Sequence, residues 1–353
     1  MLVIDGSYGE GGGQVLRTAL ALAILTGQSV RFEHIRAGRR KPGLRPQHLT
    51  GVRAAAAVCG ARLEGAALGS QMVTFVPGGP PRPGEYIFDV TEAARGGSAG
   101  SVGLVLQTVL LPLALAGGES RLTLRGGTHV PWAPSVSYLE HVFLPHLTRM
   151  GVHVQVELVR WGFYPAGGGE MQVRIMGREG PLCPILLTGR GEPRRVWGTA
   201  AVMNLPAHIP QRLAARARNV LAEAGLQAQV EPRRLRGAGP GAGIFLFAEC
   251  AHSTAGFTAY GRKGLPAERV AEAACEDLLA HHRSAGPADP HLADQLVLPM
   301  ALAAGESRVV TSRVSQHLLT NVWVVQQFLA RELRIEGEPG APGTLVVMGG
   351  EHD

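Results

Sequence analysis

The residue best suited to chemistry in this chain of 353 residues is a histidine at the start of an amphipathic segment. His317 precedes Leu318, and apolar residues then recur at helical spacing as far as Leu329, which predicts a helix that begins near His317. Ser315 and Thr320 are both candidates for its cap. The positive end of a helix dipole disfavours a charged imidazolium and attracts phosphate. His317 is therefore a candidate nucleophile beside a bound anion, although an isolated histidine more often only caps or packs.

A glycine-rich loop near the N-terminus is a second candidate site. Residues 6–13 follow a short predicted strand at 2–5 and precede a predicted helix from about 14 to 25. Clustered glycines let backbone N–H groups approach a phosphate closely, although the loop lacks the Lys-Ser/Thr ending of a Walker motif. Its one carboxylate, Glu10, suits a phosphate site only if a divalent cation lies between the two. The alternative is a flexible turn with an exposed acid.

A cationic loop at residues 35–48 follows a predicted strand at 30–32 and leads into a predicted helix from about Pro46 to Cys59. Its basic side chains are Arg36, Arg39, Arg40, Lys41 and Arg45. A solvated charge run is the common explanation for such a stretch. Here prolines and glycines hold the charges on a stiff turn, which favours a grip on a phosphate-rich substrate.

Composition narrows the function classes. The net charge of +6 favours a polyanionic partner, while aromatic residues make up only 5% of the chain, so base stacking is not its main binding device. Four scattered cysteines without CxxC spacing argue against a zinc site or a disulfide framework and indicate a cytoplasmic protein. The longest apolar stretch, residues 102–116, is interrupted by Gln107 and Pro112, so it predicts a buried helix and no membrane span. The first residues lack the basic and apolar regions of a secretory leader, so we do not expect secretion.

An internal repeat organises the chain. Residues 113–121 closely match residues 300–308, and residues 21–31 are a weaker third copy, which predicts one α/β unit used three times. Residues 190–284 do not match the repeat and read as an inserted αβ segment. Chemistry belongs where repeat-equivalent positions differ in residue type. Alignment of the two later copies places Gln107 opposite Asp294 and Val130 opposite His317.

A series of spaced motifs resembles one known family. The motifs span residues 5–6, 9–17, 36–39, 41–44, 47–49, 97–101, 106–108, 126–128, 162–169, 292–296 and 317–321. Through them the chain is similar, in order and over almost its whole length, to the RNA 3'-terminal phosphate cyclases. The resemblance implies an α/β (α+β) fold in which a large domain of three repeated βαβαββ-like units, similar to a translation initiation factor C-terminal domain, carries a small inserted αβ domain. We place the large domain at residues 1–186 and 282–353 and the inserted domain at residues 187–281.

The resemblance also implies the reaction and its residues. An RNA with a 3'-phosphate end is converted, with ATP as co-substrate and Mg²⁺ or Mn²⁺, into a 2',3'-cyclic phosphate, through a histidine-AMP and an RNA-ppA intermediate that release pyrophosphate and AMP. His317 matches the nucleophile and Glu10 the metal-binding acid. The positions expected to bind ATP are Arg17, Gln107, Pro131, His291, Leu292, Ala293, Asp294 and Gln295. Those expected to bind RNA are Arg36, Arg39, Gln47 and His48, the last also a candidate structural residue at a helix start.

One departure and two rival functions qualify this interpretation. Many members carry tyrosine at the position of His291, near the expected adenine, so we expect altered nucleotide affinity with activity kept. A cyclase-like RNA-binding scaffold of ribosome assembly lacks the nucleophile that His317 supplies. An enolpyruvyl-transferase-like enzyme shares repeated α/β units, but it leaves His317 without a role. The sequence leaves open the natural RNA, action on other nucleic-acid phosphate ends and the oligomeric state.

Overall fold

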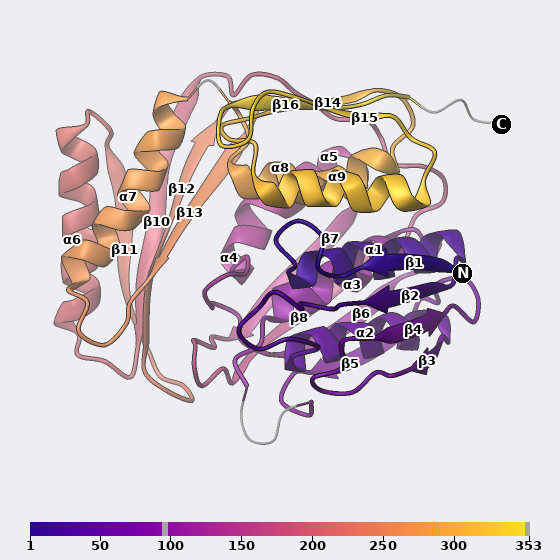
Figure 1. Cartoon of the computed structure of the whole chain (residues 1–353). Helices are drawn as coiled ribbons and strands as arrows, with labels where there is room; N and C mark the ends of the chain where they lie inside the picture. Colours follow the sequence, from indigo (N-terminus) through magenta and orange to yellow (C-terminus); the bar gives the residue numbers. More distant parts are fainter. Residues whose placement is uncertain (94–97, 285, 350–353) are drawn as a thin grey trace.

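The computed structural model describes residues 1–93, 98–284 and 286–349 (Figure 1). Residue 97 of one family motif and the last four residues of the expected large domain lie outside these ranges. The described chain contains four four-stranded sheets and the helices that cover them. The mixed α/β class expected from the sequence is therefore confirmed.

Three of the sheets share one strand order. The first contains β1 (Leu2–Asp5), β2 (Val30–Glu33), β4 (Val73–Val76) and β3 (Arg62–Glu64), in that order. The second contains β5 (Glu85–Asp89), β6 (Ser120–Gly126), β8 (Gly169–Met176) and β7 (His153–Arg160). The third contains β9 (Leu186–Leu187), β14 (Ser307–Thr311), β16 (Gly343–Val347) and β15 (Leu333–Glu336). In each sheet the first two strands are parallel and the remaining pairings are antiparallel.

The helices of these three units pack against one another inside a shell of sheets (Figure 1). They are α1 (Gly13–Thr26), α2 (Pro46–Cys59), α3 (Val102–Ala114), the continuous stretch α4 (Val136–Tyr138), η1 (Leu139–Phe143) and α5 (Leu144–Arg149), α8 (Pro290–Ala301) and α9 (Gln316–Phe328). Their apolar faces and the inner faces of the sheets form one continuous hydrophobic core. None of the helices in the described ranges combines the length and apolar character needed to cross a membrane.

The fourth sheet carries its own core. It contains β11 (Ala228–Leu235), β10 (Pro193–Met203), β12 (Gly241–Cys250) and β13 (Thr254–Tyr260), covered by α6 (His208–Glu223) and α7 (Ala267–Arg283). A second hydrophobic cluster lies between this sheet and its two helices. Both stretches that join this part to the rest meet at Arg190, whose guanidinium donates to the carbonyl oxygens of His281 at 3.2 Å and Gly286 at 2.9 Å.

The starts of α4 and α9 show which residues of the two later repeats are equivalent. Ser135 caps α4 and Ser315 caps α9 with the same contact, a side-chain oxygen that accepts from the backbone N–H three residues later. Counted from these caps, the residue equivalent to His317 is Ser137, and the predicted match to Val130 is wrong. The error arises because the connection from β6 to α4 is longer than the connection from β14 to α9.

Candidate active site

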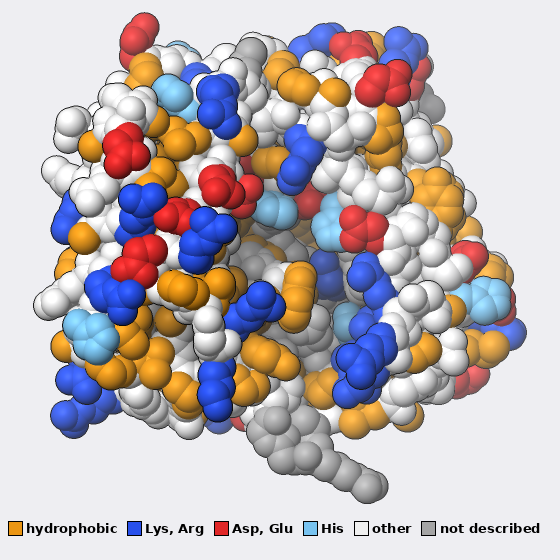
Figure 2. All heavy atoms as spheres, turned by 60° about the vertical axis from the view of Figure 1, so that its left-hand side comes forward, with side chains coloured by type: hydrophobic (Ala, Val, Ile, Leu, Met, Phe, Trp, Pro, Cys, Tyr) orange, Lys and Arg blue, Asp and Glu red, His pale blue; other side chains and the backbone are white. Residues whose placement is uncertain are grey.

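A cavity of about 670 Å³ lies among the helices of the three units and is closed on one side by the fourth sheet. Side chains of α1, α3, α8 and α9 line it, together with β13 and α7. Figure 2 shows the corresponding hollow, with histidine side chains inside it and Lys and Arg side chains on both flanks. Segments that lie far apart in the sequence therefore line one cavity.

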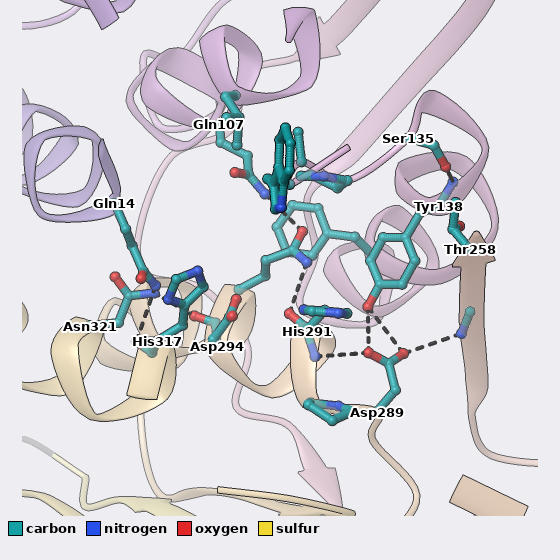
Figure 3. A pocket seen from close by; sticks show the side chains of 18 of the residues that line it. Gln14, Gln107, Ser135, Tyr138, Thr258, Asp289, His291, Asp294, His317 and Asn321 are labelled. Carbon is teal, nitrogen blue, oxygen red and sulfur yellow. Dashed lines mark hydrogen bonds between the residues drawn. The ribbon is translucent and has the colours of Figure 1, made fainter. Parts of the chain in front are cut away.

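His317 lies in the first turn of α9 and points into this cavity (Figure 3). Of the two predicted caps, Ser315 and Thr320, the residue that caps α9 is Ser315. Its hydroxyl oxygen accepts from the backbone N–H of Leu318 at 3.0 Å. Gln14 Nε2 of α1 donates to the His317 carbonyl oxygen at 3.1 Å. A cap and a neighbouring helix thus fix the backbone that carries the imidazole, as preorganised chemistry requires.

The electrostatic environment keeps the His317 ring uncharged. Its Nδ1 lies 3.2 Å from Glu10 Oε2, but the two atoms are not aligned for a hydrogen bond. Burial lowers the pKa of His317, Arg17 and Arg39 lower it further, and the Glu10 carboxylate opposes the shift. A neutral imidazole has a free nitrogen lone pair at neutral pH.

The glycine loop lies directly on α9 beside His317. Gly9 has a φ of +63°, and a Cβ at this position would lie 2.3 Å from the Thr320 hydroxyl oxygen, so only glycine fits both the backbone and the gap. The Tyr8 ring stacks on Trp323 of α9 at 3.9 Å. These contacts hold Glu10 next to the His317 ring.

Arg17 of α1 and Asp294 of α8 both line the cavity, and the charge of each affects the pKa of the other. Burial lowers the pKa of Arg17 to about 10, and Asp294 opposes that shift. Burial, followed by repulsion from Asp289, raises the pKa of Asp294 well above its ordinary value. The site therefore holds a buried cation and an acid that resists ionisation, a balance that favours an anionic ligand.

Gln107 is the only residue of α3 that is not buried. Its Nε2 donates to Gln295 Oε1 at 2.8 Å, and Gln295 Nε2 donates to the His291 carbonyl oxygen at 2.8 Å (Figure 3). The polar positions that the repeat singled out, Gln107 and Asp294, both line this cavity. Pro131 also lines it.

Two residues expected at the nucleotide do not line the cavity. Leu292 and Ala293 are fully buried in the hydrophobic core. The helical period explains this, because α8 turns His291, Asp294 and Gln295 toward the cavity and the residues between them toward the core.

The four residues expected to bind RNA lie beside the cavity and do not line it. Arg36 donates to the carbonyl oxygens of Lys41 and Gly43 within its own loop, and Gln47 accepts from the backbone N–H of Ser101. Arg39 reaches Glu10 at 3.5 Å. His48 also makes a structural contact: its Nδ1 accepts from the backbone N–H of Arg45 at 3.2 Å, at the start of α2.

The surroundings of His48 are nevertheless strongly cationic. Burial, together with the charges of Arg36, Arg17 and Arg45, lowers its pKa to about 3. Three guanidinium groups around one buried neutral ring form a patch of positive potential next to the glycine loop. Such a patch suits phosphate more than any neutral ligand.

Asp289 is the main site residue that the sequence did not reveal. It is fully buried, caps α8 by accepting from the backbone N–H of His291 at 2.9 Å and of Leu292 at 3.0 Å, and accepts from the Tyr138 hydroxyl at 2.9 Å. The Gly256 N–H of β13 donates to its second oxygen at 3.2 Å. An aspartate directly before a proline and an apolar run is a helix-start signal that was open to sequence reasoning.

Other polar links between the site helices left no signal in the sequence. Thr18 of α1 donates to Asn321 Oδ1 at 2.7 Å, and Asn321 Nδ2 donates to the Asp294 carbonyl oxygen at 2.7 Å. Thr258, Asp277 and Arg313 also line the cavity. Their partners come from distant segments, so periodicity within one segment cannot identify them.

Glu10 is the acid best placed for a divalent cation. The residues the structure describes include no group of three or more His, Cys, Asp or Glu side chains with metal-binding geometry. A single carboxylate fits Mg²⁺ when phosphate oxygens and water supply the other ligands. The donor set therefore fits a metal carried with a nucleotide and not a resident metal centre.

A family profile and individual proteins of known name match most of this chain, and they carry the same description. A sequence profile described as RNA 3'-terminal phosphate cyclase matches residues 8–335. Proteins named RNA 3'-terminal phosphate cyclase are similar: that of Methylococcus capsulatus is 58% identical over 94% of this chain and 92% of its own length. That of Trichormus variabilis is 56% identical over 93% and 94%, and that of Thermococcus onnurineus is 42% identical over 99% of both. A solved structure of the enolpyruvyl transferase NikO from Streptomyces tendae, 16% identical over 62% of this chain and 37% of that chain, has a TM-score of 0.28, which is too low to support an inference.

Proposed function

The chain belongs to the RNA 3'-terminal phosphate cyclase family, whose members are enzymes, and from this premise we propose that His317 attacks ATP to start the reaction. The proposed product is a 2',3'-cyclic phosphate at the end of an RNA that carried a 3'-phosphate. The observation that carries the assignment is the neutral imidazole of His317 at a helix N-terminus, beside Glu10 and facing the same cavity as Gln107 and Asp294.

In the first step, a nitrogen of His317 forms a bond to the α-phosphorus of ATP while the bond to pyrophosphate breaks. Nδ1 faces Glu10, and we assign the proton to Nδ1, a tautomer in which the Nε2 lone pair is free for the attack. The result is AMP bound to histidine through a P–N bond. This bond is labile to acid, because a protonated imidazole is a good leaving group.

The charge of the triphosphate must be offset before a neutral nucleophile can attack. Arg17 and the backbone amides of the glycine loop are the protein groups proposed for this task, with Arg39 at the outer side of Glu10. Mg²⁺ or Mn²⁺ held by Glu10 would supply further positive charge against the phosphates. Gln107, Asp294 and Gln295 are the proposed partners of the nucleoside.

In the later steps the RNA supplies the nucleophiles. An oxygen of its 3'-phosphate bonds to the AMP phosphorus and His317 leaves, which gives an RNA-ppA end. The vicinal 2'-hydroxyl oxygen then bonds to the 3'-phosphorus, AMP leaves and the hydroxyl proton is released. Closing a five-membered ring relies mainly on proximity. Arg36, Arg39, Gln47 and His48 remain proposals for holding this RNA end, supported by the cationic surroundings of His48.

The wider organisation is proposed on the same basis. Residues 187–281 form an inserted domain, and three repeated units similar to a translation initiation factor C-terminal domain form the rest. The separate core of the fourth sheet and the shared strand order of the other three support this division. We expect the protein to act in the cytoplasm on RNA ends.

The scaffold alternative predicts RNA binding without nucleotide chemistry, and the enolpyruvyl-transferase alternative predicts no covalent nucleotide. Incubation with α-labelled ATP and Mg²⁺ separates all three. We expect acid-labile, alkali-stable label on the wild-type protein and none on His317→Ala, while His291→Ala, one helix away, keeps measurable label. Label that persists on His317→Ala would remove this residue from the mechanism, and an unlabelled wild-type protein would favour the scaffold.

A further inference from the structure

Trp132 has an unusual combination of exposure and backbone conformation. Its side chain is 92% exposed, more than any other exposed large hydrophobic residue in the described ranges, and its φ is +61°. A bulky residue with positive φ is strained, and an indole in water forgoes the stabilisation that burial gives. Folding alone gives no reason for tryptophan at this position.

The loop that carries Trp132 is anchored on both sides, so its exposure does not reflect a free end. Thr128 donates its backbone N–H to the Gly162 carbonyl oxygen at 3.0 Å and accepts from the Val136 N–H at 3.0 Å. The Ser135 hydroxyl caps α4. Pro131 and Pro134 flank the tryptophan and restrict the backbone further. A stiff loop therefore presents the ring to solvent.

Trp132 stands at the rim of the same cavity that holds His317, Gln107 and His291. Arg17 and Arg313 also line this cavity. An RNA end must enter from solvent to reach a nucleotide bound inside. The lining also contains Asp277, Asp289 and Asp294. Arginine side chains with an exposed aromatic ring beside them are the usual device for holding single-stranded RNA, because every base has a face on which to stack.

We infer that Trp132 is a positioning residue that stacks on a base at or next to the 3' end of the RNA. The inference rests on the proposed function and adds the substrate contact that sets the terminal phosphate in place. The adenine of ATP is the competing partner. The exposure of Trp132 argues against it, since the polar groups proposed for the nucleoside lie on the inward faces of α3 and α8.

The test compares Trp132→Ala and Trp132→Phe with Ile87→Ala, a 66% exposed apolar residue of β5 outside the cavity. Binding of a short RNA with a 3'-phosphate is measured without ATP, and protein-AMP formation from labelled ATP is measured without RNA. We expect Trp132→Ala to weaken RNA binding about 5- to 150-fold, the ~1–3 kcal/mol of base–aromatic stacking. Trp132→Phe and Ile87→Ala should stay within about threefold of wild type, and ATP labelling should not change.

An RNA whose two terminal nucleotides lack bases completes the design. Wild type should bind it as weakly as Trp132→Ala binds the intact RNA, and Trp132→Ala should lose nothing further. A defect of Trp132→Ala in ATP labelling would assign the ring to adenine and overturn the inference, as would unchanged RNA binding. If wild type forms no protein-AMP, the proposed function fails, yet the RNA-binding comparison still decides the role of Trp132.

Discussion

Gly9→Ala is the sharpest single perturbation of the site that leaves the nucleophile intact. The added methyl meets two separate obstacles. The φ of +63° costs a non-glycine residue about 1–2 kcal/mol. The new Cβ would also lie 2.3 Å from the Thr320 hydroxyl oxygen, and relief of such overpacking costs about 1–3 kcal/mol more. We expect the glycine loop to lift from α9 and to carry Glu10 away from His317.

Two further variants separate these obstacles. Gly27→Ala meets a similar φ of +68° but open space, so it should lose only the ~1–2 kcal/mol of backbone strain and keep protein-AMP formation. Thr320→Ala removes the clashing oxygen and leaves the Thr320 Cβ, 3.4 Å from the added methyl, as the nearest atom. In the double variant, about 1–3 kcal/mol of coupling should return, and labelling should recover with it.

The assays are urea unfolding and the rate of labelling by α-labelled ATP, on wild type, the three single variants and the double variant. The expected order of labelling is wild type and Gly27→Ala first, the Gly9→Ala/Thr320→Ala double variant next and Gly9→Ala last. Equal behaviour of Gly9→Ala and Gly27→Ala in both assays would show that the close approach to Thr320 has no consequence. Failure of Thr320→Ala to restore either quantity would refute the steric account.

Two other predictions address the supporting carboxylate and the protonation state. Tyr138→Phe keeps the ring but withdraws the hydroxyl that donates to Asp289 at 2.9 Å, so the free energy of unfolding should fall by about 1.5–3 kcal/mol, the range for hydrogen bonds to charged groups; a urea-unfolding change below about 0.5 kcal/mol would show that the buried acid is satisfied without it. Because burial lowers the pKa of His317 below its ordinary value of 6.5, and only the neutral ring attacks, the rate of protein-AMP formation should hold as pH falls to about 6.5 and decline only below it. A half-maximal rate at or above pH 6.5 would contradict the lowered pKa.

The sequence was most informative where local rules dominate. The strand predicted at residues 2–5 is β1, and the helix predicted from about Pro46 to Cys59 is α2. For α2 the signals are local, because proline favours a helix start and glycine follows its end. Gln107 and Asp294 were singled out because a polar residue interrupts an apolar helix at equivalent places in two repeats. Contacts that join segments far apart were not accessible. The bond between Tyr138 and Asp289 spans 151 residues, and no spacing within either segment predicts it.

The wrong assignments also involve features that local sequence rules do not determine. The alignment that put Val130 opposite His317 extended a repeat through a loop whose length differs between copies, where nothing fixes the register. Leu292 and Ala293 were expected at the nucleotide because they are adjacent in sequence to His291 and Asp294, but they are buried on another side of α8. A helix shows only part of such a motif to one side.

The hydrogen bond from the Gly256 amide to Asp289 makes the segment around the fourth sheet more than an appendage. A protein without this segment would lack one hydrogen-bond donor to the buried Asp289 carboxylate, at the turn that presents His291 and Asp294. Trimming the protein to its three similar units would therefore require a replacement donor or a neutral residue at 289. The Tyr138 hydroxyl also reaches this second oxygen, at 3.1 Å, so a protein of three units would keep that donor and lose the Gly256 amide.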